Sequence, residues 1–179
     1  MTHLLPADPE AIVIEWRYSG DLSEPAKDTP DLVVRAGGRV TVGPRLAGGR
    51  PAEGRITPRR LQDLLAFALD QNRFFEIDEP ALGRKLEAAR RRRETPAAAL
   101  SPVPRGQPYP DGGTTRILIA ADGRRQAVEQ QDLFAAARDY PKIGALGRLS
   151  AIGLRMMELA QEIAGAAGPR SKNRGGRPS

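Results

Sequence analysis

The sequence predicts an α+β domain with a mainly antiparallel sheet of about five strands and two amphipathic helices on one face. Three observations lead to this class. Short runs alternate apolar and polar residues, two pairs of these runs are joined by glycine-containing turns, and two longer stretches carry apolar residues three or four apart. The order is strand, hairpin, helix, insert, hairpin, helix, which favours a two-layer α+β arrangement.

The first expected strand covers residues 12–18. Ile12, Ile14, Trp16 and Tyr18 alternate with more polar neighbours, and this period of two is typical of a strand with one buried face. Residues 1–10 precede it and are polar with two prolines, so we expect a flexible lead-in there. The single domain is then expected over residues 11–165.

The first hairpin is expected over residues 32–42. A three-residue loop, Ala36-Gly37-Gly38, would pair Val34 with Val40 and Leu32 with Val42. We prefer this register because it gathers the valines and Leu32 on one face, whereas a slip of one residue would move them off the core. Residues 43–56 are rich in Gly, Pro and Arg and are expected to form a loop.

The first helix is expected from Thr57 to about residue 72. Thr57 can cap free backbone N–H groups, and Pro58 suits the first helical position. The apolar residues that follow are three or four apart, which indicates an amphipathic helix. They are Leu61, Leu64, Leu65, Ala68 and Leu69.

An insert is expected at about residues 80–112. Its first part, residues 81–94, has the composition of an exposed helix with only Leu82 and Leu86 as apolar contacts. The rest is proline-rich, and a long segment of this kind within a domain is functional or mobile.

The second hairpin is expected at the Asp122-Gly123 turn, a strong hairpin signal that pairs Ile119 with Gln126 and Ile117 with Val128. The last helix is expected from about Lys142 to Ala164, since apolar residues from Ile143 to Ile163 form one stripe. Residues 129–141 are expected to connect them, and residues 166–179 to form a disordered basic tail.

The net charge of +6 is concentrated in two segments. Residues 84–93 contain six cations and one acid, and the last ten residues contain four cations and no acid. The remainder of the chain is therefore mildly acidic, with a net charge of −3. Arginines outnumber lysines 24 to 4, which a GC-rich genome explains as well as phosphate binding does.

Composition argues against most catalytic chemistries. The chain has no cysteine and a single histidine, His3, so thiol catalysis, zinc ribbons and histidine-based triads are not expected. No serine lies in a Gly-x-Ser-x-Gly setting, and no glycine-rich loop has a P-loop ending. We expect no enzyme activity, cofactor or metal. No segment approaches the roughly 20 apolar residues of a transmembrane helix, and a cytoplasmic protein is expected.

Two sets of residues are candidates for binding. Arginines of the insert and cations of the tail could contact nucleic acid, because guanidinium groups pair with phosphate, although neither segment has interleaved aromatic residues. Trp16 and Tyr18 would form a protein interface if they faced out of the sheet. The candidate nucleic-acid contacts are Arg90, Arg91, Arg92, Arg93, Arg170, Lys172, Arg174 and Arg177.

Several short motifs resemble the pattern of emfourin-type proteins, small bacterial α+β domains. These motifs are residues 15–20 (EWRYSG), Gly38-Arg39-Val40, residues 74–78 (FFEID) and the hairpin from Thr114 to Val128. The resemblance covers about residues 11–78 and 114–164. It implies an inhibitor of a thermolysin-like metalloprotease, and it assigns no inhibitory residue.

The functional expectation is therefore a non-catalytic protein-interaction module of a bacterial cytoplasm. Two alternatives stay open at this point: an accessory protein that binds nucleic acid through the insert and tail, and a protein inhibitor of a metalloprotease. The sequence identifies neither the partner nor the oligomeric state.

Overall fold

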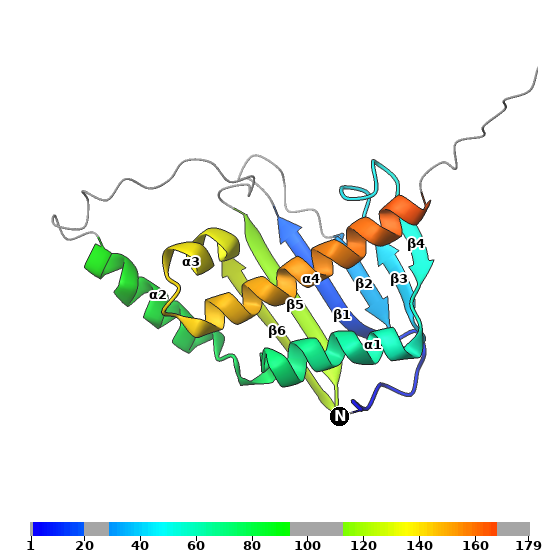
Figure 1. The fold of residues 1–179 in the computed structure, drawn as a ribbon, viewed down its shortest axis with the longest axis horizontal. Coiled ribbons are helices and arrows are strands. Elements are labelled where there is room, and N and C mark those ends of the chain that lie inside the picture. Colours follow the sequence, from blue (N-terminus) through cyan, green and yellow to red (C-terminus); the bar gives the residue numbers. More distant parts are fainter. Residues whose placement is uncertain (1, 20–28, 94–112, 168–179) are drawn as a thin grey trace, which may run out of the picture.

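A computed structural model describes residues 2–19, 29–93 and 113–167 of the chain. It confirms the α+β class (Figure 1). The antiparallel sheet has six strands in the order β4-β3-β2-β1-β5-β6. The strands are β1 Ile12–Ser19, β2 Leu32–Arg35, β3 Arg39–Val42, β4 Ala52–Arg55, β5 Thr114–Ala121 and β6 Arg124–Gln131.

Strand β1 lies at the centre of the sheet because it pairs with both β2 and β5. Trp16 opposes Leu32 on one side and Ile117 on the other, and all three side chains are buried. The expected single buried face is interrupted at the start of the strand. The register shifts between Ile12 and Ile14, and Val13 between them is also buried.

Both hairpins have the predicted register. Val34 pairs with Val40 across the Ala36-Gly37-Gly38 loop, in which Gly38 has a φ of 79° that favours glycine. In the second hairpin Ile117 pairs with Val128. Its two turn residues are Asp122 and Gly123, both with positive φ, as two-residue turns of this kind require.

The prediction of a loop over residues 43–56 is wrong for its last part, because residues 52–55 form the edge strand β4. The strand pairs with β3, so that Val40 opposes Gly54 and Val42 opposes Ala52. Its sequence, AEGR, lacks the alternating apolar residues that indicate a strand. Pairing with β3 and the helix above it therefore determine the conformation of this segment.

Helix α4 (Gly144–Ala167) crosses one face of the sheet (Figure 1). Its buried stripe includes Leu146, Leu149, Ile152, Met156 and Leu159, as the spacing predicts. The helix continues into the first two residues of the expected tail. A short additional helix, α3 (Leu133–Asp139), precedes it within the expected connection.

Helix α1 (Pro58–Leu65) begins as predicted, and the Thr57 side chain accepts a hydrogen bond from the Arg60 N–H. It buries Leu61, Leu64 and Leu65 in the same core as the sheet, and Arg60 forms an ion pair with Glu162 of α4. The expected last turns instead form a π-helix, η1 (Ala66–Gln71), followed by the 3-10 turn η2 (Phe74–Glu76).

Helix α2 (Glu79–Arg93) is the helical part of the expected insert. It extends to one side of the sheet, beside α3 and the start of α4 (Figure 1). Leu82 and Leu86 are buried in the core, which confirms them as its apolar contacts. The carboxylate of Glu79 accepts a hydrogen bond from the N–H of Glu129 on β6, so the first turn of α2 covers part of that sheet edge.

The residues before β1 are bonded to the domain. Leu4 exchanges hydrogen bonds with Asp122 of the second hairpin, and the carbonyl of Pro9 accepts one from Gly37 of the first. The segment expected to be a flexible lead-in is therefore part of the packed structure from residue 3 onward. The proline-rich part of the insert and residues 168–179 lie outside the described residues.

Candidate functional site

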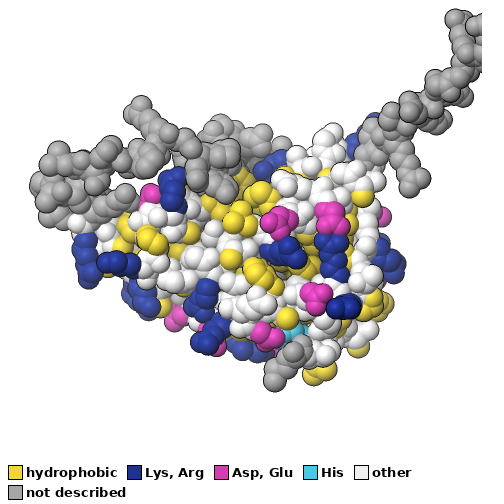
Figure 2. All heavy atoms as spheres, in the orientation of Figure 1, with side chains coloured by type: hydrophobic (Ala, Val, Ile, Leu, Met, Phe, Trp, Pro, Cys, Tyr) yellow, Lys and Arg dark blue, Asp and Glu magenta, His cyan; other side chains and the backbone are white. Residues whose placement is uncertain are grey.

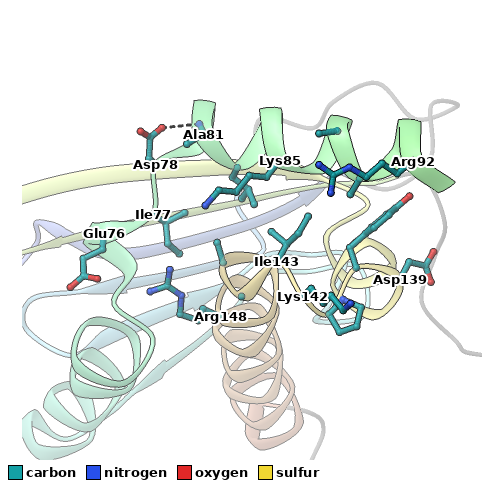
Figure 3. A pocket seen from close by; sticks show the side chains of 17 residues that line it. Glu76, Ile77, Asp78, Ala81, Lys85, Arg92, Asp139, Lys142, Ile143 and Arg148 are labelled. Atoms are coloured by element: carbon teal, nitrogen blue, oxygen red, sulfur yellow. Dashed lines mark hydrogen bonds between the residues drawn. The ribbon is translucent and has the colours of Figure 1, made fainter. Parts of the chain in front are cut away.

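The structure has a groove of about 1020 Å³ between α2 and the corner where α3 meets α4. Apolar residues line it, among them Ile77 just after η2, Leu82 of α2 and Ile143 just before α4. Figure 3 shows α2 along one side and the start of α4 along the other, with Ile143, just before α4, pointing toward α2. In Figure 2 hydrophobic side chains gather in this region, and lysines and arginines lie around its edge.

One face of α2 forms a wall of the groove. Ala81, Lys85, Ala88 and Arg92 line it at spacings of four, three and four residues, which places them on one side of a helix. Leu82 and Leu86 lie one step around the helix and hold it against the core. The wall therefore consists of small residues alternating with long cations.

The acidic side chains of the groove are engaged within the chain. The Asp78 carboxylate accepts a hydrogen bond from the Ala81 N–H at 2.9 Å, which caps the start of α2. Asp139 accepts a hydrogen bond from Arg138 at 3.0 Å, and Glu76 lies 3.9 Å from Arg73. Neighbouring N–H groups and arginines therefore partly compensate the negative charge of these three acids.

Three of the groove's cations have no ion-pair or hydrogen-bond partner among the described residues. Lys85, Lys142 and Arg148 line the groove, and no residue of the described ranges forms an ion pair or hydrogen bond with their side chains. Lys85 comes from α2, whereas Lys142 and Arg148 come from the other side (Figure 3). The groove therefore combines an apolar floor with positive charge on both sides, which suits an anionic and partly apolar ligand.

A second, smaller cavity of about 300 Å³ lies beside His3. The imidazole is only 6% exposed, its Nδ1 donates to the Asp122 carboxylate at 2.7 Å, and its Nε2 lies 3.4 Å from the Asp70 carboxylate. The hydrogen bond from His3 lowers the pKa of Asp122 below its ordinary value. Gln62 bonds both the N–H and the carbonyl of His3.

These contacts fasten the N-terminal segment to α1, η1 and the second hairpin. The two carboxylates contact opposite nitrogens of the ring, so they cannot hold one metal ion together with it. Among the described residues no group of three acidic or histidine side chains is placed to bind a metal ion. No helix in the same ranges has the length and hydropathy that crossing a bilayer requires.

The candidate nucleic-acid contacts on α2 are consecutive residues, which project to different sides of a helix. Arg90, Arg91 and Arg92 are exposed, but Arg91 forms an ion pair with Glu87 and Arg92 faces the groove. Arg93 ends the helix. The remaining candidates lie outside the described residues, and they are Arg170, Lys172, Arg174 and Arg177.

The candidate interface residues Trp16 and Tyr18 face the body of the domain. Trp16 is 1% exposed and lies under α4, where its Nε1 would be 3.8 Å from a Cβ at Gly153. Tyr18 is half-buried, with the Arg45 guanidinium 5.0 Å from its ring centre. Trp16 therefore contributes to the core and offers no contact surface.

The sheet face away from α4 carries charges that pair with one another. Glu15 accepts a hydrogen bond from Arg116 at 2.7 Å, and Arg116 also lies 3.2 Å from Glu129. Arg17 lies 3.6 Å from Glu15. The same face also carries the buried apolar side chains of Val33 and Leu118, which oppose Glu15 in the neighbouring strands.

The loop acid Asp31 has a structural role. It is buried, and its carboxylate accepts hydrogen bonds from the Tyr18 N–H at 2.6 Å and from Arg45 at 2.9 Å. A buried carboxylate with these donors holds the end of β1 close to Arg45 and to the residues just before β2.

Comparison of the chain with protein-family models, curated proteins and solved structures finds no match. The resemblance to emfourin-type inhibitors stays a prediction, and the assignment of a function depends on the geometry described above.

Proposed function

We propose that the protein is a non-catalytic, cytoplasmic interaction module that binds another protein in the groove between α2 and the α3–α4 corner. The observation that carries this proposal is the set of three uncompensated cations, Lys85, Lys142 and Arg148, around an apolar floor. Apolar area supplies affinity in protein interfaces, and charge around it selects the partner and its orientation.

The same observation favours a protein over nucleic acid as the ligand. A phosphate backbone repeats its negative charge at close intervals, so surfaces that bind it are dominated by cations. Here the acids Glu76, Asp78 and Asp139 line the groove with the cations. Two of the three uncompensated cations are lysines, which lack the planar fork that pairs with phosphate.

The test is capture of partners by the immobilised full-length protein from a bacterial lysate treated with nuclease. The Lys85→Glu/Arg148→Glu variant reverses charge inside the groove. The Arg59→Glu/Arg84→Glu variant makes the same change in net charge at exposed arginines that do not line it. Thermal unfolding of each variant verifies that the fold is kept.

We expect the wild-type protein and the Arg59/Arg84 variant to retain the same bound proteins, and the groove variant to lose them. Quantitative mass spectrometry measures the difference. Equal retention by both variants, or loss by both, would contradict the proposal, because the binding site would then lie elsewhere or depend only on total charge. Turnover of a substrate by the purified protein would contradict its non-catalytic part.

A further inference from the structure

We infer that the partner segment bound in the groove is an acidic amphipathic helix, packed between α2 and the start of α4. The inference rests on the proposed function and adds the shape and chemistry of the occupant. Its central observations are that small residues and cations alternate along the groove face of α2, and that Lys85, Lys142 and Arg148 have no ion-pair partner among the described residues.

The alanines allow a second helix to approach α2 closely. Ala81 and Ala88 are seven residues apart, two turns along one face, and Ala89 lies beside the second of them. Packed helices have axes about 8–10 Å apart, and the distance depends on the side chains at the contact. Alanines project little, so the apolar side chains of an incoming helix can fill the space between them.

The size of the groove fits a short helical segment. A helix with its side chains is about 10–12 Å across and rises 5.4 Å per turn, so two turns occupy roughly 900 Å³. The groove measures about 1020 Å³. About two turns therefore match the size of the groove. Their apolar positions would contact the half-buried side chains of Tyr140 and Ile143.

The cations of the groove determine which charge the bound helix should carry. Lys85 reaches over the groove from α2, and Lys142 and Arg148 lie on the opposite side (Figure 3). A bound helix with an apolar stripe toward the floor would present its two flanks to these cations. Acidic residues on both flanks would supply the partners that the described chain does not provide.

A designed peptide tests the inference on the full-length protein. The probe is a fluorescently labelled peptide of about 18 residues, long enough for measurable helix content, with leucines on one face and glutamates on both flanks. A second peptide has the same composition in an order that scatters the leucines around the helix. Fluorescence anisotropy at low and high salt gives the affinities.

We expect the patterned peptide to bind, more weakly at high salt, and the scattered one to bind at least about tenfold more weakly. Lys85→Glu/Arg148→Glu should weaken binding about tenfold or more, and the Arg59→Glu/Arg84→Glu control should change it by less than about twofold. Ala88→Phe fills the groove at an exposed position without changing the charge, and it should weaken binding as strongly.

Three results would overturn the inference. Equal binding of the two peptides, or binding of a DNA duplex with the same sensitivity to the groove variants, would indicate a site for polyanions. Self-association that Ala88→Phe abolishes, measured by sedimentation, would assign the groove to a second copy of the chain. No binding of the patterned peptide, combined with groove-dependent capture from the lysate, would refute the helical occupant and leave the proposed function intact.

Discussion

His3 joins parts of the chain that are far apart in sequence. Its ring donates to Asp122, 119 residues away, and its backbone is bonded to Gln62 of α1. The buried ring lies between the carboxylates of Asp70 and Asp122, and it holds the N-terminal segment at the turn between β5 and β6. His3 therefore has a structural role in this fold, because it connects the N-terminal segment to the rest of the domain.

Because the hydrogen bond from His3 lowers the pKa of Asp122 in the folded protein, this contact makes stability depend on pH. A carboxyl group whose pKa is lower in the folded than in the unfolded protein stabilises the fold at pH values above its unfolded pKa. That contribution is lost as the pH falls through the folded value. We expect His3→Ala to lower the free energy of unfolding by about 1 kcal/mol near neutral pH.

The difference in the free energy of unfolding between the wild-type protein and His3→Ala should become smaller as the pH falls below about 5, toward and past the ordinary aspartate pKa of about 3.9. Urea unfolding at a series of pH values measures it. The His3→Asn variant keeps a donor near the Nδ1 position and should lose less than His3→Ala. A difference that stays constant over the whole range would show that the Asp122 contact does not contribute.

The sequence could not predict this arrangement of His3. Its position in a polar segment before the first strand indicates an exposed residue, and only the folded chain brings Asp70 and Asp122 to it. The sequence also left open whether Trp16 faces the core or the solvent, for a related reason. Its period-two pattern locates it on one face of a strand, but the pattern does not say which face the helix covers.

At the scale of elements, α4 and the edge strand β4 depend on each other. A Cβ added at Gly54 would lie 2.7 Å from the Cδ1 of Ile163, closer than side chains approach one another. The glycine thus lets the end of α4 pack directly on β4. This contact also explains why an apolar alternation is absent from a segment that still forms a strand.

We expect Gly54→Ala to lower the free energy of unfolding by about 1–3 kcal/mol, because the added methyl group overpacks this contact. Combined with Ile163→Ala, the loss should be smaller than the sum of the two single losses. Gly83→Ala is the control, since its Cβ would meet no atom within 4 Å and alanine favours helix by up to about 1 kcal/mol. Strictly additive losses would contradict the proposed contact.

The elements that the sequence predicts well are those determined by neighbouring residues. The turn at Asp122-Gly123 and the loop at Gly37-Gly38 determine the registers of both hairpins, and a continuous apolar stripe determines α4. The π-helix at residues 66–71 was missed because its apolar residues have the same spacing as those of the preceding α-helix. Seven residues of α3 are too short for a clear helical period.

At the scale of the whole molecule, the groove exists because α2 leaves the sheet edge beside the start of α4 (Figure 1). Its two walls come from segments about 60 residues apart, and the sequence does not predict their distance in space. The one available signal was the spacing of Ala81, Lys85, Ala88 and Arg92, which describes a helix face with small residues and cations and without an apolar stripe.

In the proposed function, binding belongs to the groove beside α2, whereas the paired charges of the sheet and the His3 contacts have structural roles. Hydrogen–deuterium exchange of the full-length protein, with and without a captured partner, tests that assignment most directly. We expect slower exchange in residues 79–92 of α2 and residues 141–148 at the start of α4, with exchange in β1 and β4 unchanged. Protection confined to the sheet strands, with α2 unaffected, would contradict it.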